Sequence, residues 1–316
     1  MLTQFTSSIL MIEPVAFRFN EETATNNYYQ KVLEGVTNDQ IQSLALKEFN
    51  DFVNVLKSNG IEVVVVKDTI FPSTPDSIFP NNWISFHQDG RVVIYPMCAK
   101  NRRLERRSDI LHILRDKYNF IAHNTIDYSH YEEKNIFLEG TGSMLLDRKN
   151  KIAYAAISDR TDINIFYDFC DTFGYIPHSF VSNQTLGKER LPIYHTNVMM
   201  CLADTFVVLC ADTIDDVIER KNLIKCLESS GKEIIYITEH QKHQFAGNML
   251  QVCNKDLDRF LVMSSSAHSS LNSIQINQIE KHCPILFSSL DTIEACGGGS
   301  ARCMMAEIFL PKKSIN

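Results

Sequence analysis

The chain lacks the features that mark a zinc-bound, exported or membrane-spanning protein. Its nine cysteines include no pair separated by two residues, which argues against a zinc knuckle or a thioredoxin-type site. No apolar run reaches the roughly 18 residues of a membrane-spanning helix. The first residues lack a basic segment followed by a long apolar core, so we expect no signal peptide. Dispersed, unpaired cysteines are typical of a reducing compartment, which predicts a cytoplasmic protein.

An excess of positive charge is also missing. The 31 Lys and Arg residues are outnumbered by 38 Asp and Glu residues, which gives a formal net charge of −7, and the basic residues are dispersed. This balance argues against nucleic acid as a partner and is compatible with an enzyme that acts on a small molecule. With 316 residues, 44% of them apolar, the chain is long enough to bury a large core.

What the sequence does contain is a unit that recurs five times, in which an amphipathic helix precedes an apolar strand. The helices are expected at 41–59, 104–118, 163–174, 217–231 and 270–283, each followed at once by its strand. Pairs of strand-like runs are expected at 82–97, 143–157, 198–211, 249–264 and 303–310, the last pairing with residues 7–14. Repeated units can close into a ring with equivalent loops at one end.

One polar residue marks the entry to the first strand of each pair. These residues are Asn82, Glu139, His195, Asn248 and Cys303, at spacings of 57, 56, 53 and 55 residues. In a ring of equivalent units they would converge near the axis. A thiolate attacks electrophilic carbon, an imidazole takes and returns protons, and a carboxylate grips N–H groups. The set therefore predicts covalent catalysis on a carbon that carries nitrogen.

Three consecutive glycines, Gly297, Gly298 and Gly299, precede Cys303. Glycine suits a tight turn or the close approach of another group. The glycines would leave room for a substrate and expose backbone N–H groups that stabilise a tetrahedral intermediate. The alternative is that Cys303 is an inert thiol of the core.

Five motifs in order, PDSIFPNNW, LEGTGSM, SDRT, YHTNVMM and GGGSARCM, resemble the guanidine-modifying superfamily. That superfamily includes arginine deiminases, dimethylarginine hydrolases and amidinotransferases. The opening ILMIEPVAFRFNEETATNNYYQ is more narrowly similar to its citrulline-utilisation hydrolase branch. The resemblance runs over nearly the whole chain. It implies one catalytic domain over residues 1–316, a five-bladed, pseudo-symmetric α/β propeller (the pentein fold) of ββαβ units.

The resemblance also implies the catalytic roles. Cys303 would be the nucleophile, and His195 the general acid and base. Glu139 would bind the planar nitrogen group of the substrate and orient it. The implied mechanism uses neither a metal nor an organic cofactor.

Four further residues are candidates for binding the rest of the substrate. By resemblance, Arg160 in SDRT and Arg102 in NRRLE would hold the α-carboxylate, with Arg103 competing for the second role. For Asp76 two roles stay open, since its side chain could bind the substrate amino group or cap a turn.

By resemblance, Asn82 stands where deiminases and dimethylarginine hydrolases usually carry Asp, and Asn197 stands where deiminases have a second Asp. Two Asn residues remove two negative charges from around a guanidinium, whose burial is then disfavoured. The burial of a neutral ureido group is disfavoured less by the loss of these charges. An Asn amide can also donate to the ureido oxygen while it accepts from a ureido N–H. The sequence therefore favours hydrolysis of citrulline to ornithine, CO2 and ammonia through an S-carbamoyl intermediate. With arginine, a thiouronium intermediate would form.

Several alternatives stay open. An arginine deiminase, a dimethylarginine hydrolase or an amidinotransferase would use the same residues. A propeller that only binds, like the ribosome anti-association factors, predicts loss of the Cys–His–Glu set, which this chain keeps. The expected partner is a citrulline- or arginine-like amino acid, with no nucleic acid and no membrane. A monomer and a homodimer are equally compatible with a ring.

Overall fold

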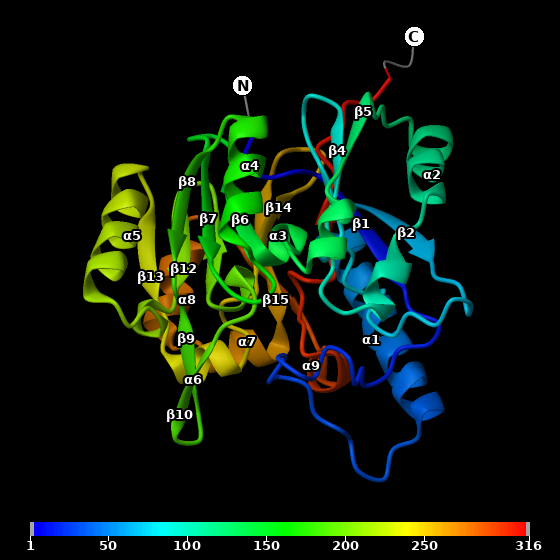
Figure 1. Ribbon diagram of the computed structural model, residues 1–316, viewed down its shortest axis with the longest axis horizontal. Helices are drawn as coiled ribbons and strands as arrows, with labels where there is room; N and C mark the ends of the chain where they lie inside the picture. Colours follow the sequence, from blue (N-terminus) through cyan, green and yellow to red (C-terminus); the bar gives the residue numbers. More distant parts are fainter. Residues whose placement is uncertain (1–2, 314–316) are drawn as a thin grey trace.

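The computed structural model describes residues 3–313 and contains five three-stranded sheets that share one topology (Figure 1). In each sheet a central strand pairs with one neighbour antiparallel and with the other parallel. The two residues before and the three residues after this range lie outside the described part of the predicted 1–316 domain.

Four sheets follow one another along the chain, and the fifth joins its two ends. The sheets are β17 (Ala306–Glu307), β1 (Ser8–Glu13) and β2 (Glu62–Lys67); β3 (Ile84–Phe86), β4 (Arg91–Ile94) and β5 (Asn124–Asp127); β6 (Met144–Asp147), β7 (Ile152–Ala156) and β8 (Ile176–Phe180); β11 (Met200–Leu202), β12 (Phe206–Leu209) and β13 (Glu233–Tyr236); β14 (Leu250–Cys253), β15 (Arg259–Ser264) and β16 (Ile285–Ser288). A separate hairpin consists of β9 (Asn183–Leu186) and β10 (Glu189–Pro192).

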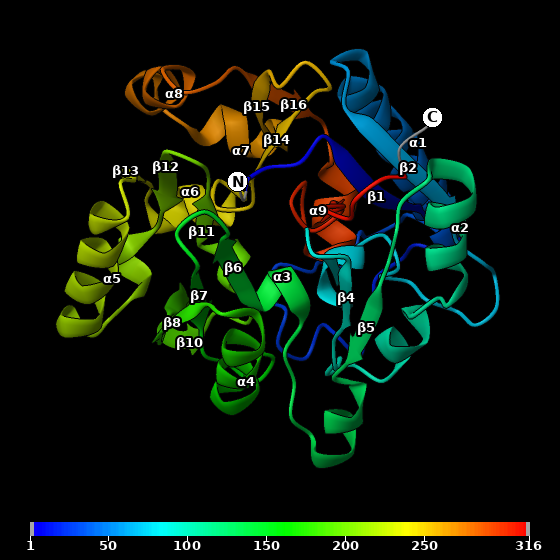
Figure 2. The same ribbon diagram turned by 90° about the horizontal axis from the view of Figure 1, so that it is seen from above.

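A helix precedes the parallel outer strand of every sheet. These helices are α1 (Asn38–Ser58), α2 (Asp109–Tyr118), α4 (Ile163–Phe173), α5 (Val217–Ser229) and α8 (Ser273–Glu280). Figure 2 shows all five at the periphery, with the strands on their inner side. Short helices and 3-10 turns lie between them: α3 (Gly140–Ser143), α6 (Glu239–His243), α7 (Ser265–Ser270), α9 (Asp291–Gly297), η1 (Pro80–Asn82), η2 (Asn101–Glu105), η3 (Ser129–Lys134), η4 (Thr196–Val198) and η5 (Ala211–Thr213).

Local sequence explains where the peripheral helices begin and which side they bury. Thr37 and Gln40 form a capping box at the start of α1, and Phe49, Phe52 and Leu56 are among the residues of α1 that are buried against the sheets. The apolar side chains that fill the space between helices and sheets form four buried clusters. The strand pairing predicted between the two ends of the chain is confirmed, because Ile9 lies opposite Glu307 in an antiparallel ladder.

Two predictions at the level of elements were incomplete. The helix predicted at 270–283 is present as α8, which begins only after the capping box of Asn272 and Gln275, whereas α7 before it was not predicted. The β9–β10 hairpin was not predicted, because its residues are mostly polar and exposed. The α/β class is confirmed, whereas no sheet joins the five units within residues 3–313, and propeller closure stays a prediction.

The short helix α3 packs against both η1 and η4, so three turns from different units meet. The close packing requires glycine at Gly140, which has a left-handed φ of +51° and whose added Cβ would lie 2.4 Å from the carbonyl oxygen of Asn81. These turns immediately adjoin Asn82, Glu139 and His195, so their packing fixes the relative positions of those residues.

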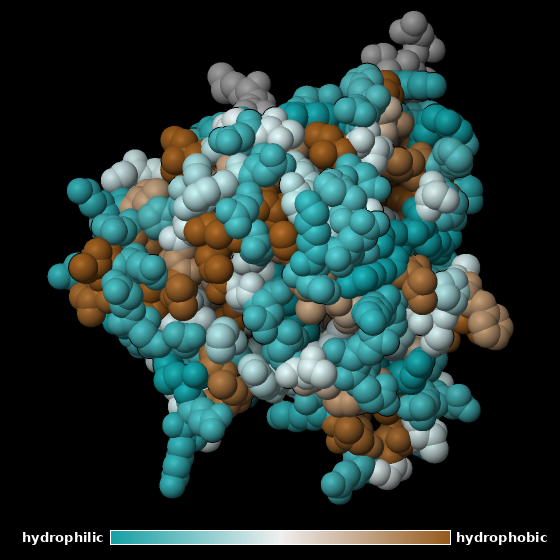
Figure 3. All heavy atoms as spheres, viewed as in Figure 1, coloured by the Kyte–Doolittle hydropathy of each residue, from teal (hydrophilic) through white to brown (hydrophobic). Residues whose placement is uncertain are grey.

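The outer surface carries no extended apolar band on the face that Figure 3 shows, where apolar groups are scattered among polar ones. None of the helices between residues 3 and 313 combines the length and the hydropathy that crossing a membrane requires.

Gly140 and Gly174 form a matched pair for testing the central packing. Both have a positive φ, but a Cβ on Gly174 would meet no atom within 4 Å. We expect Gly140→Ala to lower the free energy of unfolding by about 2 kcal/mol more than Gly174→Ala, because only the former pushes against backbone. Urea unfolding of the two variants measures the difference. Equal losses of unfolding free energy in the two variants would show that η1 moves away from the added Cβ without strain.

Candidate active site

The five periodic residues all lie in the turns that lead into the first strand of a sheet. Asn82 ends η1, Glu139 and His195 immediately precede α3 and η4, Asn248 precedes β14, and Cys303 follows α9. All five are at most 6% exposed. The chain therefore buries these polar side chains where the units meet, and their mutual contacts decide what they can do.

His195 and Glu139 form a buried pair. Nε2 of His195 lies 2.8 Å from Oε2 of Glu139, and Oε1 of Glu139 accepts the backbone N–H of Cys98 at 2.9 Å. Burial acts to raise the pKa of Glu139, but Arg160 and His195 outweigh it and hold that pKa well below its usual range. Burial lowers the pKa of His195 to about 4 although Glu139 opposes the shift, so the imidazole is neutral near pH 7.

The proton positions on His195 follow from this pair. An ionised Glu139 can only accept, so Nε2 carries the hydrogen and Nδ1 keeps its lone pair. Nδ1 lies on the side of Gly142, since a Cβ on Gly142 would be 2.9 Å from Nδ1 and 2.4 Å from Nδ2 of Asn82. His195 therefore presents a base, oriented from behind by a carboxylate.

The sulfur of Cys303 is surrounded by amide groups. Nδ2 of Asn248 lies 3.2 Å from Sγ, and Nδ2 of Asn197 lies 3.6 Å from it. Asn248 is itself fixed, because its Oδ1 accepts the backbone N–H of Arg302 at 3.0 Å. The thiol can in turn donate to Oδ1 of Asn248, which lies 3.6 Å from Sγ.

Cys303, His195 and Asn82 line one cavity, together with the three glycines. Packing requires glycine at two of these positions, since a Cβ on Gly297 or Gly299 would lie 2.8 Å from the ring of Phe79, whereas room for a substrate and N–H donors for an intermediate stay predictions. The glycines thus let the nucleophile loop, residues 297–303, approach the opposite wall.

Arg102 lies at the cavity, as predicted, and Arg103 does not line it. Nε and Nη2 of Arg102 each lie 2.9 Å from one oxygen of Glu105, and Nη1 donates to Oδ1 of Asn82 at 2.8 Å. Burial raises the pKa of Glu105 to about 7 although Arg102 opposes the shift. Much of the guanidinium of Arg102 is therefore engaged by the protein.

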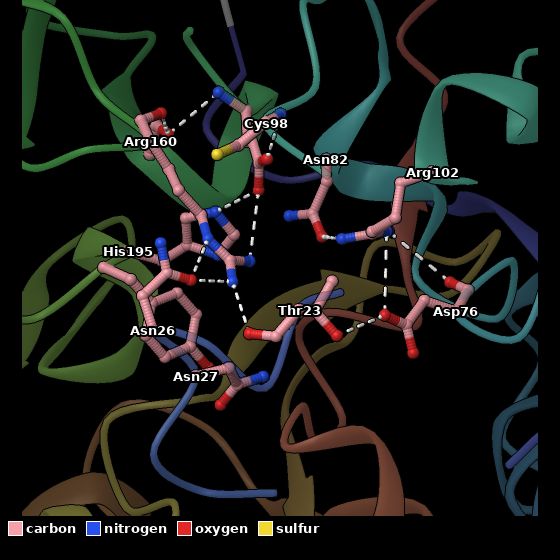
Figure 4. Close-up of polar contacts among 12 residues, drawn as sticks. Thr23, Asn26, Asn27, Asp76, Asn82, Cys98, Arg102, Arg160 and His195 are labelled. Carbon is pink, nitrogen blue, oxygen red and sulfur yellow. Dashed lines mark hydrogen bonds and ion pairs between the residues drawn. The ribbon is translucent and has the colours of Figure 1, made fainter. Parts of the chain in front are cut away.

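Arg160 also reaches the cavity, where a loop from the N-terminal part of the chain covers it (Figure 4). Its Nε donates to Oδ1 of Asn26 at 3.0 Å, its Nη2 donates to the same oxygen and to the Thr23 carbonyl at 3.1 Å, and its Nη1 lies 3.5 Å from Oε2 of Glu139. The Asn26 oxygen thus occupies the edge of the guanidinium that a carboxylate would bind.

Asp76 is buried at the same cavity, beside Arg102. Its Oδ2 accepts Asn20 at 2.7 Å and Thr23 at 3.0 Å, while its Oδ1 has no partner among the described residues. Burial raises the pKa of Asp76, although Arg102 and these hydrogen bonds oppose the shift. These contacts go beyond capping a turn, because the carboxylate connects the covering loop to the cavity wall.

The structure adds site residues that sequence reasoning missed. Residues 20–30, which we call the strap, contact Asp76, Arg160 and the nucleophile loop. Tyr194 lines the cavity beside His195. The strap was noticed only as part of the resemblance, and an isolated tyrosine in an apolar run carries no signal of its own.

These features define a class, the hydrolases that act on C–N bonds within the guanidino-modifying pentein superfamily. Residues 13–310 match the family of eukaryotic N,N dimethylarginine dimethylhydrolases, and the chain belongs to this family. The superfamily resemblance is thereby confirmed. No curated protein matches the chain by sequence.

Solved structures share the fold at low identity. Apo ArgZ, an arginine dihydrolase from the ornithine–ammonia cycle in cyanobacteria, has a TM-score of 0.73 at 16% identity, over 97% of this chain and 41% of ArgZ. The product-bound N-terminal domain of ArgZ has a TM-score of 0.70 at 17% identity, over 96% of this chain and 99% of that domain. A dimethylarginine dimethylaminohydrolase adduct with S-methyl-L-thiocitrulline has a TM-score of 0.61 at 12% identity, over 96% of this chain and 100% of that one. The chain thus spans about two fifths of full-length ArgZ.

The lowered pKa of His195 makes stability depend on pH in a defined direction. The folded chain binds this proton more weakly than the unfolded chain, where the pKa is near 6.5, so stability is lost as pH falls from 6.5 toward about 4. Between about pH 7 and pH 5, we expect the wild type to lose about 2 kcal/mol more than His195→Gln. Urea unfolding at both pH values measures this.

Two further points make the pH comparison specific. Glu139 affects the pH dependence of stability only below its ordinary pKa of 4.5. Its pKa in the folded chain is depressed, so its contribution to the free energy of unfolding is lost at still lower pH. His130→Gln, at an exposed turn, is the control and should follow the wild type. If His195→Gln also followed the wild type, the imidazole would not be held neutral by the fold.

Proposed function

We propose that this protein hydrolyses the ureido C–N bond of citrulline or a closely related amino acid, with Cys303 as the nucleophile. His195 is the general base and acid, and Glu139 orients it. The remaining predicted residues bind the substrate: Asn82, Asn197, Asp76, Arg102 and Arg160. Membership of the hydrolase family and the shared cavity of Cys303 and His195 support this proposal.

The observation that carries the choice of citrulline is the orientation of the Asn82 amide. Its Oδ1 is already bonded to Arg102, and its Nδ2 is buried without a partner among the described residues. A buried donor requires an acceptor. A guanidinium has only donors, whereas a ureido group carries an oxygen. Asn197 supplies the complement, since its buried Oδ1 is unpaired within the described residues and can accept a substrate N–H.

The first half of the reaction breaks the bond to ornithine. Nδ1 of His195 takes the thiol proton of Cys303, and the sulfur attacks the ureido carbon. Asn82 donates to the developing oxyanion. His195, held by Glu139 while charged, returns the proton to the departing δ-nitrogen. Ornithine leaves, and a carbamoyl group stays on the sulfur.

The second half regenerates the thiol. Nδ1 of His195 takes a proton from water, whose oxygen attacks the S-carbamoyl carbon, and the C–S bond breaks. Cys303 regains the proton from His195, and carbamate decomposes to CO2 and ammonia. The sum is citrulline plus one water giving ornithine, CO2 and ammonia.

The amino-acid end of the substrate fits the charged groups around the strap. A carboxylate would bind the Nε–Nη2 edge of Arg160 in place of Asn26, which makes two contacts there with one oxygen. The free Oδ1 of Asp76 can accept the α-ammonium group. Substrate binding therefore exchanges a strap contact for a contact with the ligand.

Arginine is a second candidate substrate. ArgZ is described as an arginine dihydrolase, and the related AgrE as a complex with ornithine and NAD+. If arginine is accepted here, ammonia leaves first through a thiouronium intermediate, and the citrulline formed passes through the steps above.

We further propose that the five units close as a five-bladed propeller around this site. Inner strands of successive units contact each other, β17 with β3, β6 with β11 and β11 with β14, and α1 contacts β16. A cytoplasmic location and the choice between monomer and homodimer remain predictions.

The test of the reaction is a product assay with citrulline and arginine in parallel. From citrulline we expect one ammonia per ornithine, and a loss of at least about 1,000-fold in Cys303→Ala because no other group can replace the nucleophile. Cys226→Ala, at a half-buried thiol outside the cavity, should keep full activity. Citrulline accumulating from arginine without ornithine would identify a deiminase instead.

Asn82→Asp tests the basis of substrate choice. The substitution replaces the buried donor by a carboxylate that repels the ureido oxygen, so kcat/KM for citrulline should fall about 10- to 100-fold. Arginine should lose less, since its guanidinium pairs with the new charge. Steady-state assays with both substrates measure the ratio. Equal losses for the two substrates would contradict a direct contact between Asn82 and the ureido oxygen.

A further inference from the structure

We infer that Tyr194 is a positioning residue of this site, holding the nucleophile loop through its hydroxyl and Arg160 through its ring. The inference about Arg160 rests on the proposed function, whereas the inference about the nucleophile loop does not. Tyr194 directly precedes His195, is 5% exposed and lines the cavity. Its backbone is fixed because its carbonyl oxygen accepts Oγ of Ser158 at 2.8 Å.

The hydroxyl of Tyr194 holds the loop that carries the nucleophile. It donates to the carbonyl oxygen of Gly298 at 2.9 Å. Gly298 ends α9 in a left-handed conformation, with φ of +63°, five residues before Cys303. Burial raises the pKa of Tyr194 far above its usual range, and the charge of Cys303 acts in the same direction. The hydroxyl therefore remains a donor while the thiolate forms.

The ring of Tyr194 contacts two other groups of the site. The guanidinium of Arg160 lies over it, 4.8 Å from its centroid, and the imidazole of His195 lies 4.8 Å away at 56°. A cation over an aromatic face is attracted by it. One side chain thus touches the nucleophile loop, the base and the proposed carboxylate-binding residue.

The ring is itself supported from behind. Tyr29 of the strap meets it edge-on at 6.3 Å. The hydroxyl of Tyr29 accepts Nζ of Lys242 at 2.7 Å, and this fully buried lysine also donates to Gln184 at 2.7 Å. The ring of Tyr194 thus packs against a strap residue whose own hydroxyl is held by a buried lysine, which supports one position of the ring.

Separate variants test the hydroxyl and the ring. In Tyr194→Phe we expect kcat to fall about 10-fold with KM changed by less than about twofold, because one loop contact is lost and the ring stays. The rate at which iodoacetamide alkylates Cys303, followed by mass spectrometry of its peptide, should change by about threefold or more. In Tyr194→Leu, KM should also rise about 10-fold because Arg160 loses its support.

Tyr95→Phe is the matched control. Its hydroxyl is equally buried and bonded to Ser85 at 2.7 Å, but it does not line the cavity. It should leave the alkylation rate and kcat within about twofold of the wild type.

The outcomes separate this inference from the proposed function. Alkylation does not require a substrate. A changed alkylation rate in Tyr194→Phe, combined with a wild type that turns over neither citrulline nor arginine, would therefore overturn the proposed function and keep the loop contact. An unchanged alkylation rate and kcat in Tyr194→Phe, in an otherwise active enzyme, would overturn the loop contact. A KM in Tyr194→Leu equal to that of the wild type would overturn the role of the ring.

Discussion

The site depends on one buried charge, the carboxylate of Glu139. It is fully enclosed, and it is held by the backbone of Cys98, by His195 and by Arg160. A carboxylate buried without such donors would bind a proton. Because it stays ionised, it determines which nitrogen of His195 carries the hydrogen, and so which nitrogen keeps the lone pair of a base. Gly140 helps to place this carboxylate, since glycine at that position allows the turn after Glu139 to pack against η1.

The arginines show how the same charge constrains substrate binding. Arg160 balances Glu139 and is shared with the strap, while Arg102 is hydrogen-bonded to Glu105 and orients Asn82. Neither arginine is simply a free cation at the mouth of a cavity. In the proposed reaction, Arg102 acts on the reacting end of the substrate through the Asn82 amide that it orients. Arg160 must exchange its contact with the strap before it can bind a carboxylate, so binding and strap position are physically linked.

Much of this arrangement was predictable because each unit places its polar residue at the same structural point. The constant spacing of Asn82, Glu139, His195, Asn248 and Cys303 follows from one helix and three strands per unit, and it predicted their convergence without any knowledge of contacts. The strap and Tyr194 were not predictable in this way. Their contacts join segments more than 100 residues apart and depend on side-chain packing, which no local period records. The predicted start of the last peripheral helix at residue 270 was too early, because the capping box at Asn272 sets the start of α8.

The amides around Cys303 connect the fold to the choice of substrate. A guanidinium substrate brings a positive charge to the sulfur and so helps the thiolate to form, whereas a neutral ureido group does not. An enzyme for the neutral group must supply the stabilisation from its own residues. Asn248 and Asn197 direct N–H groups at the sulfur, and His195 becomes a cation when it takes the thiol proton. Asn197 is common to both sets, since it is one of the two Asn residues that stand where the resemblance places Asp, and its amide is directed at the sulfur.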